Sequence, residues 1–172
     1  MLSAAAEGCY GIAMMTRSQS DERGANVHFP PPLVFVGSTL LGVGLAYIAP
    51  IPFFTSTWMR VLGIIVLLAG LALMIAAVRE FRRTGQDPKP WKPSPELVLQ
   101  GPYLLTRNPM YVGFTIVQFG LGVALGNLWI SLLAPVALLV VHFIAVLPEE
   151  RYLEEKFEDA YREYRRRVRR YV

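Results

Sequence analysis

The sequence predicts an all-α integral membrane protein with four transmembrane helices and a C-terminal cytoplasmic amphipathic helix. The 172 residues are 53% hydrophobic with a mean hydropathy of +0.38, which is high for a soluble domain. The apolar residues are gathered into four long runs without Asp, Glu, Lys or Arg. Half of the 30 charged residues lie instead in segment 149–172. A soluble fold does not account for this separation of apolar and charged residues.

Each apolar run is close to the length that crosses a bilayer. A helix rises ~1.5 Å per residue and the hydrocarbon layer is ~30 Å thick, so about 20 residues span it. Backbone polar groups in lipid must pair within their own segment, so each run is predicted to be a helix. We place the spans at about 33–51, 61–78, 109–126 and 128–147. Because only Asn127 separates the last two runs, they are predicted to form a tight antiparallel hairpin.

Basic residues predict the orientation of these helices. Segment 79–107 contains six Lys and Arg residues and segment 149–172 contains eight, whereas the opposite side offers Arg60 and the Asn127 turn. The positive-inside rule therefore places the 79–107 connection and both termini in the cytoplasm. Residues 1–31 are predicted to be a disordered N-terminal tail, and residues 32–172 a single membrane domain.

The last segment, 149–172, has the pattern of an amphipathic helix. Large apolar residues recur at spacings of three and four, which is the period of one helix face. Acidic residues dominate the first half and arginines the second, an order that suits the helix dipole. The residues of the apolar face are Leu153, Phe157, Tyr161, Tyr164 and Val168.

Composition also excludes several classes of site. The single Cys9 allows no internal disulfide and no cysteine metal site. The two histidines, His28 and His142, are far apart in the chain, so we predict no metal. A net charge of +4 beside so many apolar runs favours the anionic lipid surface, and not nucleic acid, as the partner.

Polar residues in segment 101–113, GPYLLTRNPMYVG, lie at the cytoplasmic start of the third span. Asn108 followed by Pro109 is typical of a helix start, because Asn caps and Pro suits the first helical position. The free N–H groups of such a start also favour an anion, such as a ligand carboxylate. Arg107 is alternatively an anchor at the membrane surface. Tyr103 and Tyr111 are alternatively interfacial aromatic residues.

A second polar cluster, Pro148-Glu149-Glu150-Arg151, directly follows the fourth span. Adjacent carboxylates at this place are either the solvated start of the tail helix or a functional pair. The hairpin brings them next to residues 107–111. Two acids suit a cationic ligand, while an Arg and a helix start suit an anionic one; S-adenosylmethionine carries both charges, although spacing alone does not identify it. His142, inside the fourth span, is a further functional candidate or a neutral side chain bonded to a neighbouring helix.

Together these motifs resemble the isoprenylcysteine carboxyl methyltransferase family and, more loosely, the phospholipid methyltransferases. The family pattern is Gly-x-Tyr, Arg-His-Pro-x-Tyr-x-Gly, a hairpin, Glu-Glu and a Phe…Tyr…Tyr…Arg-Val tail. The resemblance covers about residues 79–172. Asn108 departs from it where the family has His, and Glu158 departs where the tail often has Gly after Phe, which favours a continuous tail helix here. The matching residues are Gly101, Pro102, Tyr103, Arg107, Pro109, Tyr111, Gly113, Glu149, Glu150, Phe157, Tyr161, Tyr164, Arg167 and Val168.

The resemblance implies a membrane methyltransferase that uses S-adenosylmethionine in a pocket open to the cytoplasm. The acceptor is then a lipophilic molecule that arrives through the bilayer, such as a prenylated cysteine or a lipid headgroup, and a bacterial inner membrane is the expected location. Arg167 is predicted to orient the acceptor, with Glu150 and Arg107 as further catalytic residues. The neighbouring Arg165, Arg166, Arg169 and Arg170 are predicted to contact anionic lipid headgroups. The predicted cofactor-binding residues are Gly101, Pro102, Tyr103, Asn108, Pro109, Tyr111, Glu149 and Glu150.

Three other classes of membrane protein fit the sequence less well. A small multidrug transporter also has four spans but needs an acid within one of them, and none of the four runs contains Asp or Glu. A reductase of the related sterol-reductase group would use NADPH, whose phosphates need more basic residues near Arg107. A non-catalytic membrane scaffold gives no reason for these motifs to lie together. The methyltransferase is therefore the preferred hypothesis.

Overall fold

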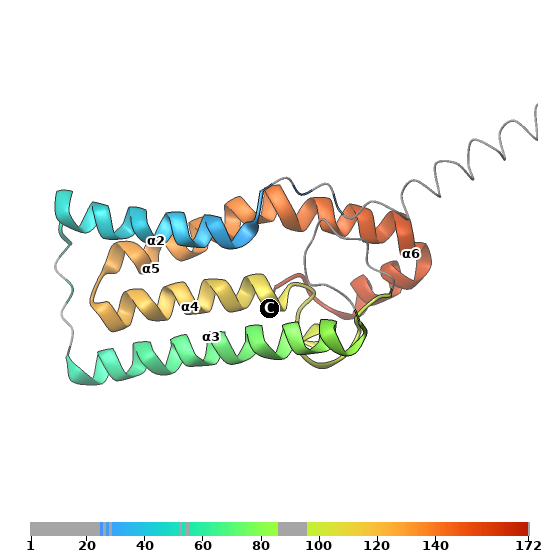
Figure 1. Ribbon diagram of the computed structural model, residues 1–172, viewed down its shortest axis with the longest axis horizontal. Coiled ribbons are helices and arrows are strands. Elements are labelled where there is room, and N and C mark those ends of the chain that lie inside the picture. The colour runs from blue at the N-terminus through green and yellow to red at the C-terminus, as the bar shows by residue number, and fades with distance from the viewer. Residues whose placement is uncertain are drawn as a thin grey trace, which may run out of the picture.

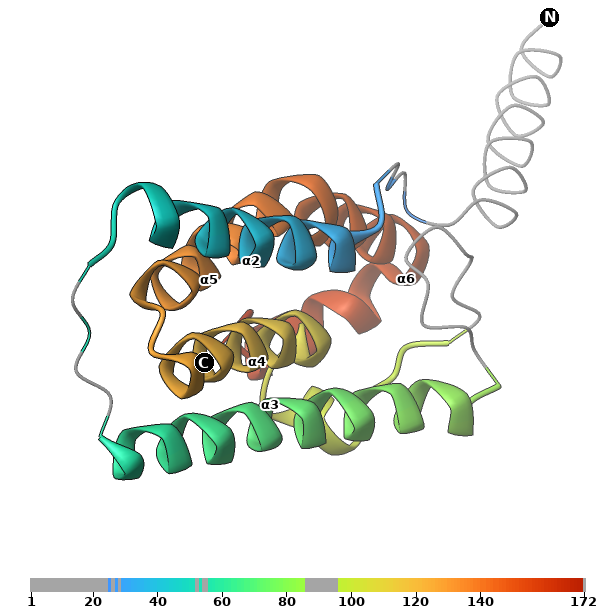
Figure 2. The same cartoon turned by 60° about the vertical axis from the view of Figure 1, so that its left-hand side comes forward.

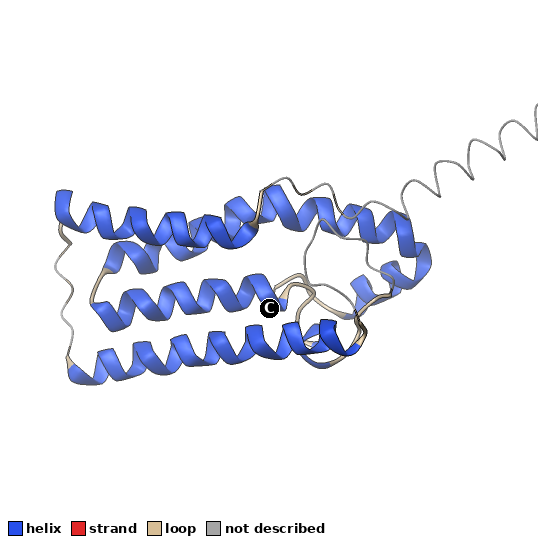
Figure 3. Cartoon of the chain, viewed as in Figure 1, coloured by secondary structure: helices blue, strands red, loops and turns tan. Residues whose placement is uncertain are grey.

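A computed structural model describes residues 25, 27, 29–51, 53, 56–85 and 96–171, and every regular element in this part of the chain is a helix (Figure 3). Almost all of the predicted disordered tail, 1–31, lies outside the described residues, so its disorder stays a prediction. Residues 86–95, in the connection between the second and third predicted spans, also lie outside the described residues.

The long helices lie side by side along the molecule (Figure 1). Helix α2, α3 and the continuous helix α5–η2–α6 are each long and apolar enough to cross a membrane. Helix α4 is apolar but has 17 residues. The elements in order are α2 (Pro31–Ile48), α3 (Thr57–Arg83), η1 (Gly101–Leu104), α4 (Pro109–Leu125), α5 (Leu128–Val141), η2 (His142–Val146) and α6 (Leu147–Arg167).

Large apolar side chains cover the outside of this bundle. Leu40 of α2, Leu62 of α3 and Leu139 of α5 are all more than half exposed. An apolar surface of this extent is unfavourable in water and marks contact with a membrane or a partner. The side chains packed inside the bundle are small by comparison, such as Ala134 and Ala137, which are buried. The bundle therefore has the inside-out pattern of a membrane protein.

Helices α4 and α5 form the predicted tight hairpin. Gly126 ends α4 in the left-handed conformation, with φ of 68°, which glycine adopts without a steric penalty. The Asn127 side chain then accepts a hydrogen bond from the Ile130 amide at 3.3 Å and so caps α5. It also donates to the Gly42 carbonyl of α2 at 3.3 Å. This turn fixes the antiparallel pairing that brings the start of α4 beside the end of α5.

Helices α3 and α4 approach each other at backbone distance. A Cβ atom added to Gly70 of α3 would lie 2.8 Å from the Val117 amide nitrogen of α4. One added to Gly120 of α4 would lie 2.5 Å from the Leu67 nitrogen of α3. Any larger residue would therefore force the helices apart. Small residues of this kind allow close packing in lipid, where helices gain no hydrophobic energy by associating.

A wide turn joins α5 to α6 without breaking the helix. Segment η2 is π-helical, and the Leu147 amide donates to the His142 carbonyl, five residues earlier. Pro148 follows directly. A proline inside a helix removes one N–H donor and collides with the preceding turn, and a wider turn relieves that collision. The result is one helical rod from Leu128 into the polar end of the molecule.

Helix α6 bends at Glu158, where φ is 45° and ψ is −116°. The expectation of a continuous tail helix is therefore wrong at this residue, because the chain keeps the turn that a glycine usually makes. The helix also ends at Arg167, earlier than the predicted residue 172, and Val168 is extended. A residue with a Cβ atom is strained in this backbone conformation, at a cost of about 1–3 kcal/mol.

Glycine at position 158 is therefore expected to stabilise the protein. Glu158→Gly should raise the free energy of unfolding by roughly 1 kcal/mol, since relief of strain outweighs the added backbone entropy of the unfolded chain. The matched control is Glu155→Gly in the same helix, which should destabilise by roughly 1 kcal/mol. Thermal unfolding in detergent measures both. Equal destabilisation by the two substitutions would show that residue 158 is not strained.

Candidate active site

The candidate active site lies at the polar end of the bundle, where η1, the start of α4 and α6 meet (Figures 1 and 2). Gly101 opens η1 with φ of 58°, and a Cβ atom there would lie 3.0 Å from Cγ of Glu80. Both the backbone angle and this close approach require glycine. The short helix then places the Tyr103 ring in the core against Phe81, with ring centroids 5.5 Å apart.

Glu150 is the centre of a charged cluster. Arg107 Nη1 lies 2.9 Å from Glu150 Oε1, and both side chains are only 9% exposed. Arg170 binds the same carboxylate in a fork, with Nε donating at 2.9 Å and Nη2 at 2.7 Å. Arg107 also donates to the Tyr161 hydroxyl at 3.5 Å. Because two arginines share this one carboxylate, the cluster carries a net positive charge. Glu150 is therefore poorly suited to bind a cationic ligand.

Glu149 has a different environment. Its only described hydrogen-bond partner is the Tyr111 hydroxyl, which donates at 2.7 Å to Oε1. Burial raises the pKa of Glu149 to about 7, with a smaller contribution from the charge of Glu150, while the Tyr111 hydrogen bond opposes the shift. An acid that is costly to ionise and lacks a basic partner gains most from a cationic ligand.

The extended segment Val168–Tyr171, which we call the strap, returns from α6 to the start of α4. The Arg107 amide donates to the Arg169 carbonyl at 2.9 Å. The Arg170 carbonyl accepts from Thr106 Oγ1 at 2.9 Å and from Asn108 Nδ2 at 3.1 Å. The Tyr171 hydroxyl lies 2.8 Å from His142 Nδ1.

Asn108 occupies the N-cap position of α4, as predicted, but its side chain makes no capping hydrogen bond. The prediction of a capping side chain is therefore wrong, although the helix does begin at Pro109. The reason is the donation to the Arg170 carbonyl, which uses the amide group for the strap.

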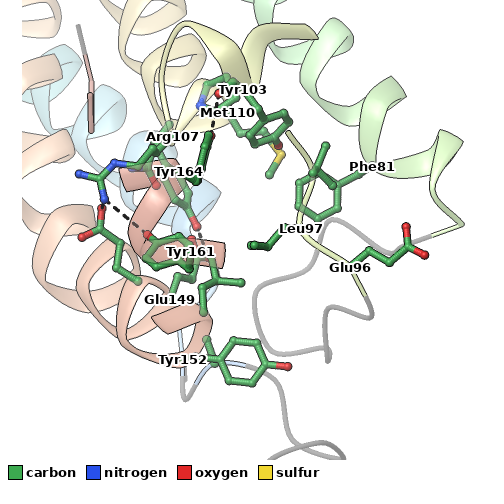
Figure 4. A pocket seen from close by; sticks show the side chains of 17 residues that line it. Phe81, Glu96, Leu97, Tyr103, Arg107, Met110, Glu149, Tyr152, Tyr161 and Tyr164 are labelled. Atoms are coloured by element: carbon green, nitrogen blue, oxygen red, sulfur yellow. Dashed lines mark hydrogen bonds and ion pairs between the residues drawn. The ribbon is translucent and has the colours of Figure 1, made fainter. Parts of the chain in front are cut away.

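A pocket opens beside these groups (Figure 4). Its lining combines apolar side chains with acids, an arginine and several tyrosines. Two buried donors of the lining, the Tyr103 hydroxyl and Arg107 Nε, have no hydrogen-bond partner among the described residues. Buried donors without partners favour a ligand that supplies acceptors. The apolar residues of the lining include Phe81, Leu97, Val98, Met110 and Leu153.

Most residues predicted for the cofactor line this pocket, namely Tyr103, Asn108, Pro109, Tyr111, Glu149 and Glu150. Gly101 and Pro102 do not line it but shape the turn that places Tyr103; the Pro102 carbonyl accepts the amides of Leu105 and Thr106. Glu150 and Arg107, predicted to be catalytic, are paired at its edge.

The structure does not bring Arg167 to the pocket. Its side chain is 75% exposed and lies 2.7 Å from Glu163, on the outer surface of α6. His142 does not line the pocket either, because it contacts the strap. The wide turn at η2 changes the angular spacing between His142 and Glu149, so the two do not share a face as regular helical spacing predicts.

Sequence reasoning missed the role of Arg170, which it assigned to lipid headgroups. Nothing in the run of five arginines near the C-terminal end distinguishes this residue from its neighbours. Tyr161 and Tyr164 were predicted as residues of the helix face and of the family pattern, without a role in the pocket, yet both line it.

Comparison with known proteins agrees with this geometry. Residues 58–160 match the phospholipid methyltransferase family. This match includes α3, α4, α5 and most of α6. The chain belongs to the phospholipid methyltransferase family. It is therefore a multi-pass membrane protein of a methyltransferase family, as the resemblance implied.

A stretch of 72 residues is also 39% identical to protein-S-isoprenylcysteine O-methyltransferase of Schizosaccharomyces pombe. That alignment covers 42% of this phospholipid methyltransferase family member and 30% of the yeast protein. The predicted relationship to isoprenylcysteine methyltransferases is thereby confirmed. The short coverage means that the yeast protein's acceptor is not carried over by the match itself.

Proposed function

We infer that this protein transfers a methyl group from S-adenosylmethionine to a lipophilic acceptor at the membrane surface. The observation that carries the proposal is the pocket at the end of the hairpin. Among the described residues, Glu149 has no basic partner there and two buried donors have no acceptor. Membership of a methyltransferase family supports the reaction type. The name of the yeast relative supports the carboxylate of a prenylated cysteine as the acceptor.

The residues of the pocket fit this cofactor. S-adenosylmethionine, when bound, supplies an electrophilic methyl group on a sulfonium centre. Glu149 offers a carboxylate to a cationic group, with the Tyr111 hydroxyl holding it in place. Tyr103 and Arg107 offer donors to an anionic or polar group. The apolar wall excludes water, which strengthens each of these contacts.

Whether the reaction needs a general base depends on the chemical class of the acceptor. A carboxylate acceptor is ionised at neutral pH, so it requires only positioning and desolvation. An amine acceptor must lose a proton. Glu149 suits that task better than Glu150, because the Glu150 carboxylate is already engaged by two arginines. A base with a pKa near the working pH is the most effective.

The proposed membrane arrangement has four spans, with α4 as the third, and both termini in the cytoplasm. The apolar length of α4 and its close packing against α3 support its place in the bilayer. The basic residues near the Arg83 end of α3 support a cytoplasmic site. The tail helix, with buried Tyr161 and Tyr164 and exposed arginines, would then lie along the membrane surface.

Labelling from either side tests this orientation. In a Cys9→Ser background, Thr57→Cys and Thr84→Cys place single exposed cysteines at the two ends of α3. In sealed, right-side-out vesicles, an impermeant maleimide should label the cysteine at position 57 and leave that at 84 unlabelled. Inverted vesicles should reverse the result. Labelling of position 84 from outside would contradict the cytoplasmic location of the site.

Thermal-shift measurements in detergent test the cofactor. S-adenosylmethionine and its demethylated product should both raise the unfolding midpoint, and NADPH should not. Transfer of a labelled methyl group to a prenylcysteine analogue, compared with lipid extracts, then tests the acceptor. Stabilisation by NADPH alone would instead support a reductase.

The affinity for S-adenosylmethionine should depend on pH through Glu149. Because its pKa is raised to about 7, the carboxyl is mostly protonated at pH 6 and mostly ionised at pH 8. Binding of a cation should thus strengthen by about tenfold over this range. The same raised pKa makes the free protein less stable as pH increases from about 4.5 to 7. Calorimetry should show a flat profile for Glu149→Gln; an unchanged slope would remove Glu149 from the site.

A further inference from the structure

The strap, Val168–Tyr171, is held against the rest of the fold by several polar contacts. Its backbone accepts three hydrogen bonds from the start of α4 and the residues before it, donated by Thr106, Arg107 and Asn108. Its last described side chain, Tyr171, contacts His142. Val168 anchors the other end in an apolar cluster with Tyr161 and Tyr164.

These contacts fix the position of one residue of the strap, Arg170. Arg170 is fixed at its carbonyl by Thr106 and Asn108, and its guanidinium forks Glu150 at 2.9 and 2.7 Å. Glu150 in turn pairs with Arg107 at the pocket wall. A continuous chain of contacts therefore runs from the Asn108 amide, through Arg170 and Glu150, to Arg107.

The contact with His142 has a specific structural origin. His142 is the first residue of the π-helical segment, where the helix is wider than its neighbours. Such wide turns are rare and are found mostly at functional sites. Here the turn lies where the His142 ring meets Tyr171, with ring centroids 6.0 Å apart. Through this contact, Tyr171 holds its end of the strap against the long apolar helix that contains His142.

We propose that the strap is a positioning element of the active site, and that Asn108, Thr106 and His142 act on methyl transfer by holding Arg170 in place. This proposal rests on the proposed function for its chemistry. It gives Asn108 a different role from the cofactor contact predicted from the sequence, because its side-chain amide is bound to the strap. In this role the strap fixes the side-chain positions of the Arg107–Glu150–Arg170 cluster.

The position of the strap can be measured without turnover. Val168 is 6% exposed, so in a Cys9→Ser background a Val168→Cys thiol should react with N-ethylmaleimide only when the strap lifts. Thr106→Val, Asn108→Ala and Tyr171→Phe each remove one anchoring hydrogen bond. Each should accelerate the reaction about 2- to 10-fold, the range expected for one net hydrogen bond. Thr106→Ser keeps the hydroxyl and should restore the slow rate.

Arg166→Ala is the matched control. Arg166 lies in the last turn of α6, just before the strap, and its side chain is 79% exposed. Its only described ion-pair partner is Glu163. The substitution should leave the labelling rate unchanged. Unchanged labelling in all three anchor variants would contradict the proposal. Thermal midpoints within a few degrees of the parent protein would show that the variants remain folded.

Kinetics separate positioning from simple stability. The anchor variants should lower kcat by a similar factor while the KM for S-adenosylmethionine stays within about twofold, because the cofactor contacts are intact. Faster labelling with unchanged kcat would overturn the positioning role. Absence of methyl transfer by the parent protein would contradict the proposed function alone, since the labelling rates test the strap independently.

Discussion

Glu150→Gln is expected to destabilise the protein by roughly 3 kcal/mol, while Glu149→Gln leaves it at least as stable as the parent at neutral pH. Glu150 neutralises Arg107 and Arg170, and the Arg107 side chain is 9% exposed. Removing the carboxylate leaves two guanidinium groups close together without an acid, and breaking a buried pair costs about 3–5 kcal/mol. Glu149 has no basic partner in the described part of the chain, and its charge is costly to bury.

The two acids should differ in the opposite sense in ligand binding. Glu149→Gln should weaken S-adenosylmethionine by roughly 1–3 kcal/mol, the scale for losing a charged hydrogen-bonding partner. Glu150→Gln should weaken it less, once protein is measured at a temperature where the variant is folded. Unfolding in detergent and calorimetry on the same preparations provide both quantities. Equal losses of stability and of affinity in the two variants would contradict this division of roles.

Arg170→Ala should lower turnover by roughly 10- to 100-fold, because charged hydrogen bonds of this kind contribute about 1.5–3 kcal/mol. The fork on Glu150 explains the size of the effect. Arg167→Ala should change turnover by less than about threefold, since its partner Glu163 lies on the exposed face of α6. This order is the reverse of the one predicted from the sequence, where Arg167 orients the acceptor and Arg170 binds lipid.

Arg170→Lys is the decisive companion variant. A lysine keeps the charge but cannot make both hydrogen bonds of the fork, so it should recover only part of the turnover. Salt separates a headgroup contact from a pocket contact, because an exposed contact weakens with ionic strength and a shielded one does not. A large, salt-insensitive loss in Arg167→Ala would restore Arg167 to the acceptor role.

The sequence was sufficient to predict the helices and to predict that residues 107–111 lie close to Glu149 and Glu150. Apolar runs without charge predict helices in lipid whatever their partners are, so the starts at Pro109 and Leu128 follow from local chemistry. The single residue between two runs dictates a hairpin, and the hairpin brings Tyr111 to Glu149. These inferences depend only on residues close together in the chain.

Other features depended on contacts between distant residues. Which arginine reaches Glu150 is decided by where α6 ends and by its bend at Glu158, neither of which the charge pattern records. The use of the Asn108 amide depends on the Arg170 carbonyl, 62 residues away. Regular helical spacing also fails across η2, because a wide turn shifts every later residue around the axis. Local propensity cannot predict such long-range competition for hydrogen bonds.

The unbroken helix from Leu128 through η2 gives the site a fixed depth in the membrane. From Asn127 at one end to Glu149 at the other, the helix spans roughly 30 Å, about the thickness of the hydrocarbon layer. The length of this helix would therefore place the reactive groups at the boundary of one leaflet. Acceptors would be selected by where their reactive atom sits along the bilayer normal, as well as by chemistry. Under the proposed function, a lipid acceptor in the opposite leaflet would have to cross the bilayer before methyl transfer.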